Sequence, residues 1–227
     1  MKSFQQSILD GSILNRRKAK GLSQPILIGS KNREKQTLLR SLFDNLRKEL
    51  EPIEPDQSAP SPIEEGDDHH TIAIVKARYW SKVANGFAIS SDGGLLIPAL
   101  KNKWDSTKTN RAAGDNTSGL EKVHFLLSLM SNLVKEQRRA AWIESVAIAK
   151  NGELVNVWTA KSVMGYILPK PNGHAPDGLW TSSLHYFPNV KKTIPEMSSN
   201  ELTLSNDPWT TIKTQIESFS RNSQWYV

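Results

Sequence analysis

The chain has 227 residues, enough for one large domain or for a small element joined to one domain. It contains no cysteine, which excludes disulfides, iron–sulfur clusters, thiolate zinc sites and cysteine nucleophiles. The net charge of +6 and the sequence pI near 9.4 are compatible with a polyanionic partner, or with nothing more than good solubility.

Charge is sorted by position along the chain. Residues 1–50 hold eleven Lys and Arg against four Asp and Glu, whereas residues 51–70 hold seven acids and no Lys or Arg. Residues 71–227 return to a net charge of about +6. This pattern predicts a basic head (1–50), an acidic flexible linker (51–70) and a globular body (71–227).

The head is predicted to be helical, and its basic side chains favour contacts with phosphate groups. Residues 17–24 resemble the junction between the first two helices of repressor-type helix-turn-helix domains, over eight residues only, with Ser23 as the cap of the second helix. The alternative is a basic helix end that stops at Gly21. Residues 25–29 are apolar and fit either a strand or one helical turn.

A clearer helix is predicted over residues 33–50, where apolar side chains recur at helical spacing after Asn32, a suitable N-cap. One amphipathic helix cannot bury its apolar seam alone, so it needs the first helix, the body or a second copy. An alternative function follows, in which the chain is a protein–protein adaptor or self-associates through residues 33–50. The seam residues of that alternative are Leu38, Leu42, Leu46 and Leu50.

The predicted linker carries four prolines besides its seven acids, a composition typical of a flexible segment. Its last four residues, Asp67, Asp68, His69 and His70, are of the types that bind metal ions. Four consecutive residues cannot all converge on one ion, so we interpret them as a solvated linker end and expect no metal site.

The body is predicted to begin with a strand at residues 71–80, which are rich in β-branched and aromatic side chains. Two hairpins follow, at residues 87–97 and 146–155. In each, an Asp-Gly or Asn-Gly pair lies between apolar runs, as a tight turn requires.

Two helices are predicted within the body. The first occupies residues 118–134, begins with a capping box formed by Ser118 and Glu121, and is apolar enough to pack across a sheet. The second begins at Asp207-Pro208, a cap followed by proline at the first helical position.

Residues 29–36 follow an apolar run and precede a helix, which is the setting of a phosphate-binding loop. The P-loop pattern nevertheless fails. Glu34 stands where its second glycine would be, and Gln36 stands where a hydroxyl would hold magnesium. A carboxylate also has the wrong charge beside phosphate, so the sequence argues against nucleotide binding here.

An enzymatic site is a further alternative. His174, Asp177 and His185 lie in the 170–187 segment, whose Gly- and Pro-rich loop is of a kind that often carries functional residues. No nucleophile elbow, metal-protease motif or paired-carboxylate signature accompanies them. We expect no cofactor, and we favour a protein that is not an enzyme.

The sequence thus predicts an α+β protein: a small basic helical N-terminal element, an acidic Pro-rich linker, and a mixed domain with antiparallel hairpins packed on a central apolar helix. The favoured function is a DNA- or RNA-binding accessory or regulatory protein that contacts the phosphate backbone. No signal peptide or membrane span is recognised, which favours a cytoplasmic protein without membrane contacts. The expected phosphate contacts are Arg16, Arg17, Lys18, Lys20, Lys31, Arg33, Lys35, Arg40, Arg138 and Arg139.

Overall fold

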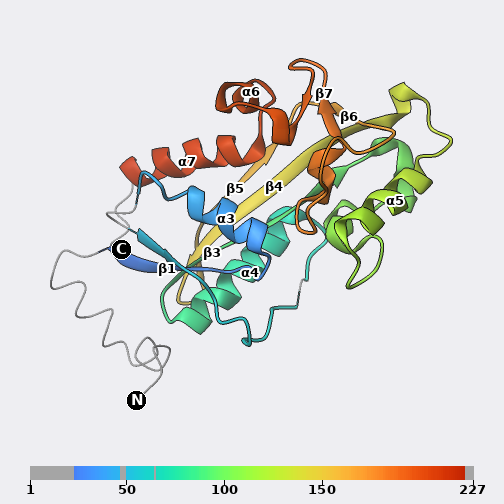
Figure 1. Ribbon diagram of the computed structural model, residues 1–227. Helices are drawn as coiled ribbons and strands as arrows, with labels where there is room; N and C mark the ends of the chain where they lie inside the picture. Colours follow the sequence, from blue (N-terminus) through green and yellow to red (C-terminus); the bar gives the residue numbers. More distant parts are fainter. Residues whose placement is uncertain (1–22, 47–49, 64, 223–227) are drawn as a thin grey trace. The chain divides into compact units, whose positions relative to one another are not determined.

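A computed structural model describes residues 23–46, 50–63 and 65–222 of the chain (Figure 1). The chain divides into two compact units. Unit 1 comprises Met1–Asp92, Ser145–Trp158 and Ile212–Val227, and unit 2 comprises Gly93–Glu144 and Thr159–Thr211. Each unit combines segments that are far apart in the sequence, so the division does not coincide with the predicted head, linker and body.

Unit 1 contains a parallel β-sheet. β1 (Gln24–Ile28) lies between β2 (Leu50–Ile53) and β3 (Phe87–Leu96) and runs parallel to both. Almost every residue of β1 is buried, as expected for a strand covered on both faces. Since Gln24 begins a strand, no helix starts at Ser23, which removes the helix-turn-helix interpretation. Residues 50–53, placed in the linker by composition, form β2 in this sheet.

The predicted helix after Asn32 is confirmed at its start. α3 (Arg33–Ser41) is capped by the Asn32 side chain, which accepts a hydrogen bond from the amide of Lys35. The helix ends at Ser41, however, and Leu50 already belongs to β2. The apolar seam of this segment continues across both elements, because Leu39, Leu42, Phe43, Leu46 and Leu50 are all buried.

The predicted strand at residues 71–80 is a helix. α4 (His69–Ala84) begins at the capping residue Asp68, whose side chain accepts from the amide of Thr71. Buried positions recur at helical spacing, and Trp80 packs against Leu27 and Ala88 of the parallel strands. Packing of this seam outweighs the strand propensity of its β-branched residues.

Of the two predicted hairpins, the one at residues 146–155 forms and the one at residues 87–97 does not. β4 (Arg139–Lys150) and β5 (Glu153–Lys161) pair with each other and are joined by Asn151 and Gly152, both at positive φ, so this hairpin is confirmed. Asp92-Gly93 instead lies inside the continuous ten-residue strand β3. Pairing of β3 with its neighbours β1 and β4 overrides the local turn signal.

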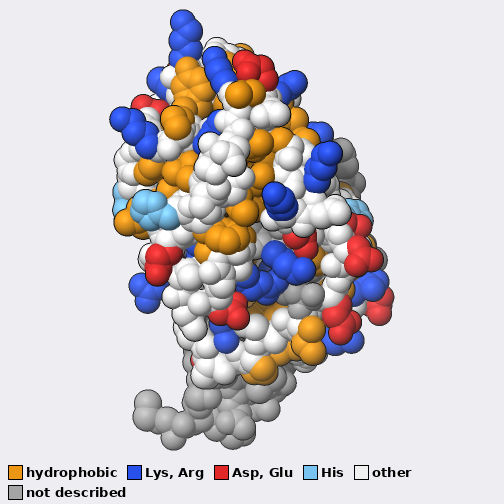
Figure 2. All heavy atoms as spheres, turned by 90° about the vertical axis from the view of Figure 1, so that its right-hand side faces the viewer, with side chains coloured by type: hydrophobic (Ala, Val, Ile, Leu, Met, Phe, Trp, Pro, Cys, Tyr) orange, Lys and Arg blue, Asp and Glu red, His pale blue; other side chains and the backbone are white. Residues whose placement is uncertain are grey.

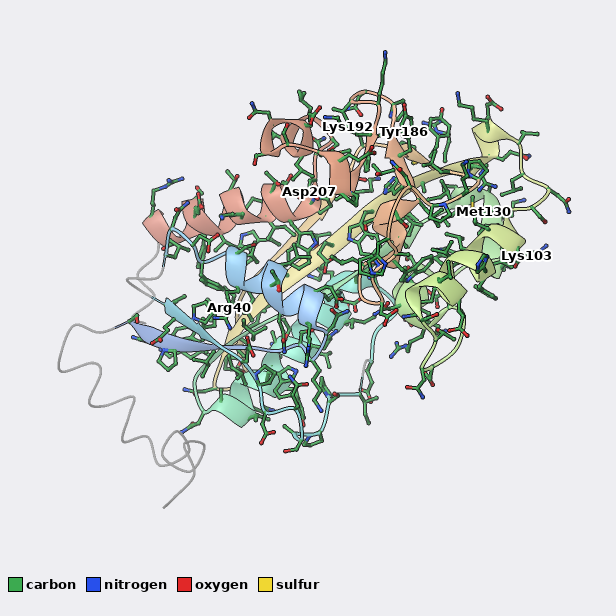
Figure 3. All side chains as sticks on the ribbon, viewed as in Figure 1. Arg40, Lys103, Met130, Tyr186, Lys192 and Asp207 are labelled. Carbon is green, nitrogen blue, oxygen red and sulfur yellow. The ribbon has the colours of Figure 1, made fainter. Side chains whose placement is uncertain are left out.

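Unit 2 continues from β3 and β4 into β6 (Gly165–Ile167), β7 (His185–Phe187) and β8 (Lys192–Thr193), which pair antiparallel in that order. Its core is formed around α5 (Gly119–Leu129), which has the predicted capping box. Val123, Leu126 and Met130 are buried there, while Leu120 remains exposed. Met130, Tyr186 and Lys192 are marked in Figure 3.

The remaining helices are short, except the last. Five 3-10 helices within the described residues are η1 (Pro98–Lys103), η2 (Ser106–Arg111), η3 (Lys135–Arg138), η4 (Trp180–Ser183) and η5 (Ile194–Glu196). They are followed by α6 (Ser199–Leu204) and α7 (Pro208–Asn222). α7 begins where predicted, with the carboxylate of Asp207 accepting from the amide of Thr210. The fold therefore mixes helices with a sheet that has parallel and antiparallel strands, as the α+β prediction requires in outline.

Candidate active site

A short loop, residues 29–32, joins the carboxyl end of β1 to the first turn of α3. The Ser90 hydroxyl and the ring of Trp80 occupy the space that a Cβ at Gly29 would need, so this position requires glycine. A side chain of α3 stabilises the loop: Gln36 donates a hydrogen bond to the carbonyl oxygen of Ser30 at 2.8 Å. The N-terminus of α3 therefore faces the end of the strand, and helix N-termini attract anions.

A buried polar cluster lies in the same unit. His69 Nδ1 is 2.6 Å from Asp92 Oδ2, and Lys76 Nζ is 3.7 Å from Asp92 Oδ1. His69 is only 5% exposed and Asp92 only 6%. The interpretation of Asp67 to His70 as a solvated linker end is thus wrong for three of the four: Asp68 caps α4, His69 and His70 lie in its first turn, and His69 is buried against Asp92.

These two features are brought together by strand pairing. β1 and β3 are parallel neighbours with Ile28 opposite Ile89, so residues 29–32 and residues 90–92 follow at the same edge of the sheet. The Ser90 hydroxyl donates to the carbonyl oxygen of Gly29 at 3.1 Å, and the buried Ser91 hydroxyl has no partner among the described residues. In open α/β sheets, ligands bind at the carboxyl ends of the strands.

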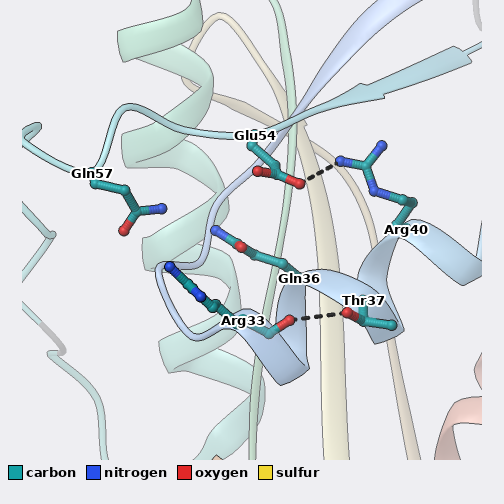
Figure 4. A pocket seen from close by; sticks show the side chains of 6 residues that line it. All are labelled: Arg33, Gln36, Thr37, Arg40, Glu54 and Gln57. Carbon is teal, nitrogen blue, oxygen red and sulfur yellow. Dashed lines mark hydrogen bonds and ion pairs between the residues drawn. The ribbon is translucent and has the colours of Figure 1, made fainter.

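An open polar pocket of about 430 Å³ lies beside α3 (Figure 4). Arg40, also marked in Figure 3, forms an ion pair with Glu54 at 2.8 Å across it and donates to the carbonyl oxygen of Pro52. Arg33 is exposed at the start of the helix. The lining residues are Arg33, Gln36, Thr37, Arg40, Glu54 and Gln57.

The residues expected to contact nucleic acid belong to different parts of the chain. Arg16, Arg17, Lys18 and Lys20 lie outside the described residues. Lys31, Arg33 and Lys35 flank the start of α3 and Arg40 follows, whereas Arg138 and Arg139 belong to unit 2. In Figure 2, Lys and Arg side chains are scattered among hydrophobic and acidic ones.

Arg138 has a structural position in unit 2. Its guanidinium donates to the carbonyl oxygens of Met130, Ile167 and Leu168 at 2.8–2.9 Å. Burial lowers the pKa of Arg138 from its ordinary value. The side chain thus ties three backbone segments together, while its neighbour Arg139 is exposed.

The three weak catalytic candidates have separate environments. His174 is exposed, and the Asp177 carboxylate accepts a hydrogen bond from the amide of Gly119 at the start of α5. His185 is fully buried, and burial lowers its pKa to about 4. His185 is thus buried within unit 2, whereas the exposed Asp177 accepts a hydrogen bond at the start of α5.

Three other expectations concern a protein partner, a membrane and a metal ion. The seam proposed for an adaptor is occupied within the chain, since Leu42, Leu46 and Leu50 are buried in unit 1. Among residues 23–46, 50–63 and 65–222, no helix is long and apolar enough to cross a membrane. Across the same residues, no group of three or more His, Asp or Glu side chains is placed to hold a metal ion.

Comparison with known proteins identifies the family. Residues 26–204 match the model of the Ham1 family, and the chain belongs to that family. The dITP/XTP pyrophosphatase of Lactobacillus acidophilus is 26% identical over 183 residues, covering 79% of this chain and 89% of that protein. The enzyme of the same name from Shouchella clausii is 26% identical over 195 residues, covering 85% and 96%.

Solved structures agree on the fold. The HAM1 protein from Coxiella burnetii superposes with a TM-score of 0.71 at 23% identity, covering 88% of this chain and 100% of that one. The Ham1 protein of Staphylococcus aureus gives a TM-score of 0.66 at 21% identity, covering 86% and 99%.

The family assignment overturns the prediction of a nucleic-acid-binding regulatory protein and of a nucleic-acid partner. That prediction rested on the sorted charge of residues 1–70, whereas the family model matches residues 26–204. Sequence reasoning also missed the cluster of His69, Lys76 and Asp92. The only local signal for it was Asp68, a capping residue that places His69 and Lys76 on one helix.

Proposed function

We propose that this chain is a nucleoside-triphosphate pyrophosphatase, the activity for which its curated relatives are named. One observation carries the proposal. In unit 1, the loop at residues 29–32 follows the end of β1, and Asp92 lies in β3 three residues beyond Ile89, the partner of the last β1 residue, Ile28. This arrangement supports an anion site beside a proton acceptor, which hydrolysis of a phosphoanhydride requires.

The loop supplies the phosphate side of the site. The first-turn amides of a helix have no intrahelical acceptor, and the helix dipole adds positive potential at that end. Lys31, Arg33 and Lys35 flank the same turn and raise that potential further. Glu34, which made the sequence pattern unfavourable, lies in the first turn as one acid beside three cations. A triphosphate therefore meets a net positive surface.

Asp92 supplies the proton acceptor. A water molecule attacks the α-phosphorus, a new P–O bond forms, and the bridging bond to the β-phosphate breaks, so that pyrophosphate leaves with the bonding electrons. The water proton passes to the Asp92 carboxylate. Its Oδ1 forms an ion pair with Lys76 Nζ at 3.7 Å, a distance longer than a hydrogen bond, so this oxygen can still accept the proton.

Enzymes usually handle triphosphates as Mg²⁺ complexes, held by one or two carboxylates together with the phosphates. Asp92 offers one carboxylate, but His69 and Lys76 already contact its two oxygens. The described residues therefore do not fit a metal held by the protein, and every step above is assigned to side chains. Mg²⁺ belongs in the assay as the companion of the nucleotide.

The test is product analysis with the full chain. Purified protein is incubated with dITP, XTP or ATP and Mg²⁺, and the nucleotide products and pyrophosphate are separated by anion exchange. We expect nucleoside monophosphate and pyrophosphate in equal amounts, with Asp92→Asn at least about 100-fold slower. Asp67→Asn, which changes an exposed acid immediately before the capping residue of α4, serves as the control and should match wild type. Release of diphosphate and inorganic phosphate, or no hydrolysis of any of the three, would contradict the proposal.

A further inference from the structure

The core-facing side of α4 carries polar residues among its apolar ones, namely the buried His69 and Ser81 and the partly buried Lys76. Ile72, Ala73, Ala77 and Trp80 form its apolar part. His69 and Lys76 lie on the same face, seven residues apart, which is close to two helical turns. Both side chains reach Asp92 of β3.

The two contacts hold the carboxylate from both sides. His69 takes Oδ2 and Lys76 takes Oδ1, so a single helix determines the orientation of both oxygens. An ionised carboxylate can only accept hydrogen bonds, and the 2.6 Å contact therefore puts the shared proton on His69 Nδ1. The contact is slightly shorter than the range of about 2.7–2.9 Å that is usual for an N–H donor on a carboxylate.

Stability alone does not account for the cluster. A buried set of ionisable groups is seldom more stabilising than apolar side chains of similar volume, because each group loses its hydration. The cluster also lies just beyond the point where β3 passes the end of β1, from which the phosphate loop follows.

We propose that His69 is a positioning residue, which holds the Asp92 carboxylate in the orientation that takes the proton from the attacking water. The inference rests on the proposed function. His69 acts through Asp92 and touches neither the nucleotide nor the water. Loss of the Nδ1–H contact lets the carboxylate turn about its side-chain bonds, which slows the chemical step and leaves nucleotide binding largely intact.

The experiment compares three substitutions at His69 in the full chain. His69→Ala removes the donor and should lower kcat by 10- to 100-fold, the order of effect seen for residues that orient a functional group, with KM changed less than about threefold. His69→Asn carries an amide nitrogen near the Nδ1 position and should recover most of kcat. His69→Gln places its nitrogen one carbon further out and should not.

His70→Ala is the matched control, since His70 is the next residue in the same helical turn and is exposed. It should behave as wild type, and thermal melts of all variants establish that each is folded. Wild-type kcat in His69→Ala, or equal losses in His69→Asn and His69→Ala, would overturn the inference while the proposed function stands. An inactive wild-type protein would overturn the proposed function, and this inference with it.

Discussion

The ring of His185 donates from Nε2 to the carbonyl oxygen of Ala140, 3.1 Å away, inside unit 2. Its other nitrogen, Nδ1, is buried without a partner among the described residues, and the ring packs on Phe187 at 4.2 Å between centroids. Such a histidine is held neutral, because charging it would bury an uncompensated cation.

Stability should therefore depend on pH through His185. Its pKa is about 4 in the folded chain and near 6.5 in the unfolded chain, so only the unfolded chain takes up the proton between these values. The contribution of the neutral His185 to the free energy of unfolding is complete above about pH 6.5. It is lost as the pH falls toward 4, and the loss is at most about 3 kcal/mol. Urea unfolding at pH 7.5 and pH 5 measures it. His185→Phe should show a smaller loss, and an identical loss in both proteins would rule this source out.

Arg138 should contribute to stability and not to ligand binding. Arg138→Ala leaves three backbone carbonyl oxygens without their donor, and we expect the free energy of unfolding to fall by about 3 kcal/mol. Arg139→Ala, an exposed neighbour, should change it by less than about 0.5 kcal/mol. Chemical denaturation of both variants makes the comparison, and equal effects would contradict the structural role.

Asn32 allows the phosphate loop to be tested apart from helix stability. Asp caps a helix as well as Asn does, so Asn32→Asp should leave the melting temperature within about 2 °C of wild type. The added negative charge should repel a triphosphate and raise KM by about tenfold. Steady-state kinetics and a thermal melt give the two readouts. An unchanged KM would place the phosphates elsewhere.

Gly29 should tolerate no side chain. A Cβ there would overlap the Ser90 hydroxyl and come within 2.5 Å of the Trp80 ring, and overpacking of this kind costs about 1–3 kcal/mol. Gly86 provides a control, since a Cβ there meets only the Ala84 carbonyl oxygen at 3.6 Å. Gly86→Ala should be neutral or stabilise the chain by up to about 1 kcal/mol. Denaturation midpoints distinguish the two variants, and equal midpoints would contradict the packing at Gly29.

The local sequence was sufficient to predict where several helices begin and where one hairpin turns. Asn32, the Ser118/Glu121 pair and Asp207 each start a helix as predicted, because capping depends on residues three positions apart. The Asn151-Gly152 hairpin formed for the same reason, since its turn needs only two residues at positive φ.

Predictions failed where distant segments compete with local preference. Residues 71–80 have strand propensity but form a helix, because Trp80 and its seam pack on β1 and β3. Asp92-Gly93 has the residue types of a tight turn but lies within β3, which pairs with the neighbouring strands β1 and β4. The linker composition of residues 51–70 did not prevent residues 50–53 from joining the sheet beside β1.

By itself, the sequence determined the caps, the Asn-Gly hairpin and a mixed fold without cysteine chemistry, all of which depend on neighbouring residues. Only the tertiary structure decided which charged side chains contact one another. His69 and Asp92 are 23 positions apart and were assigned to a linker and a turn, yet they form a 2.6 Å contact because α4 packs on the parallel strands. Burial and strand register bring such groups together, and neither can be read from net charge along the chain.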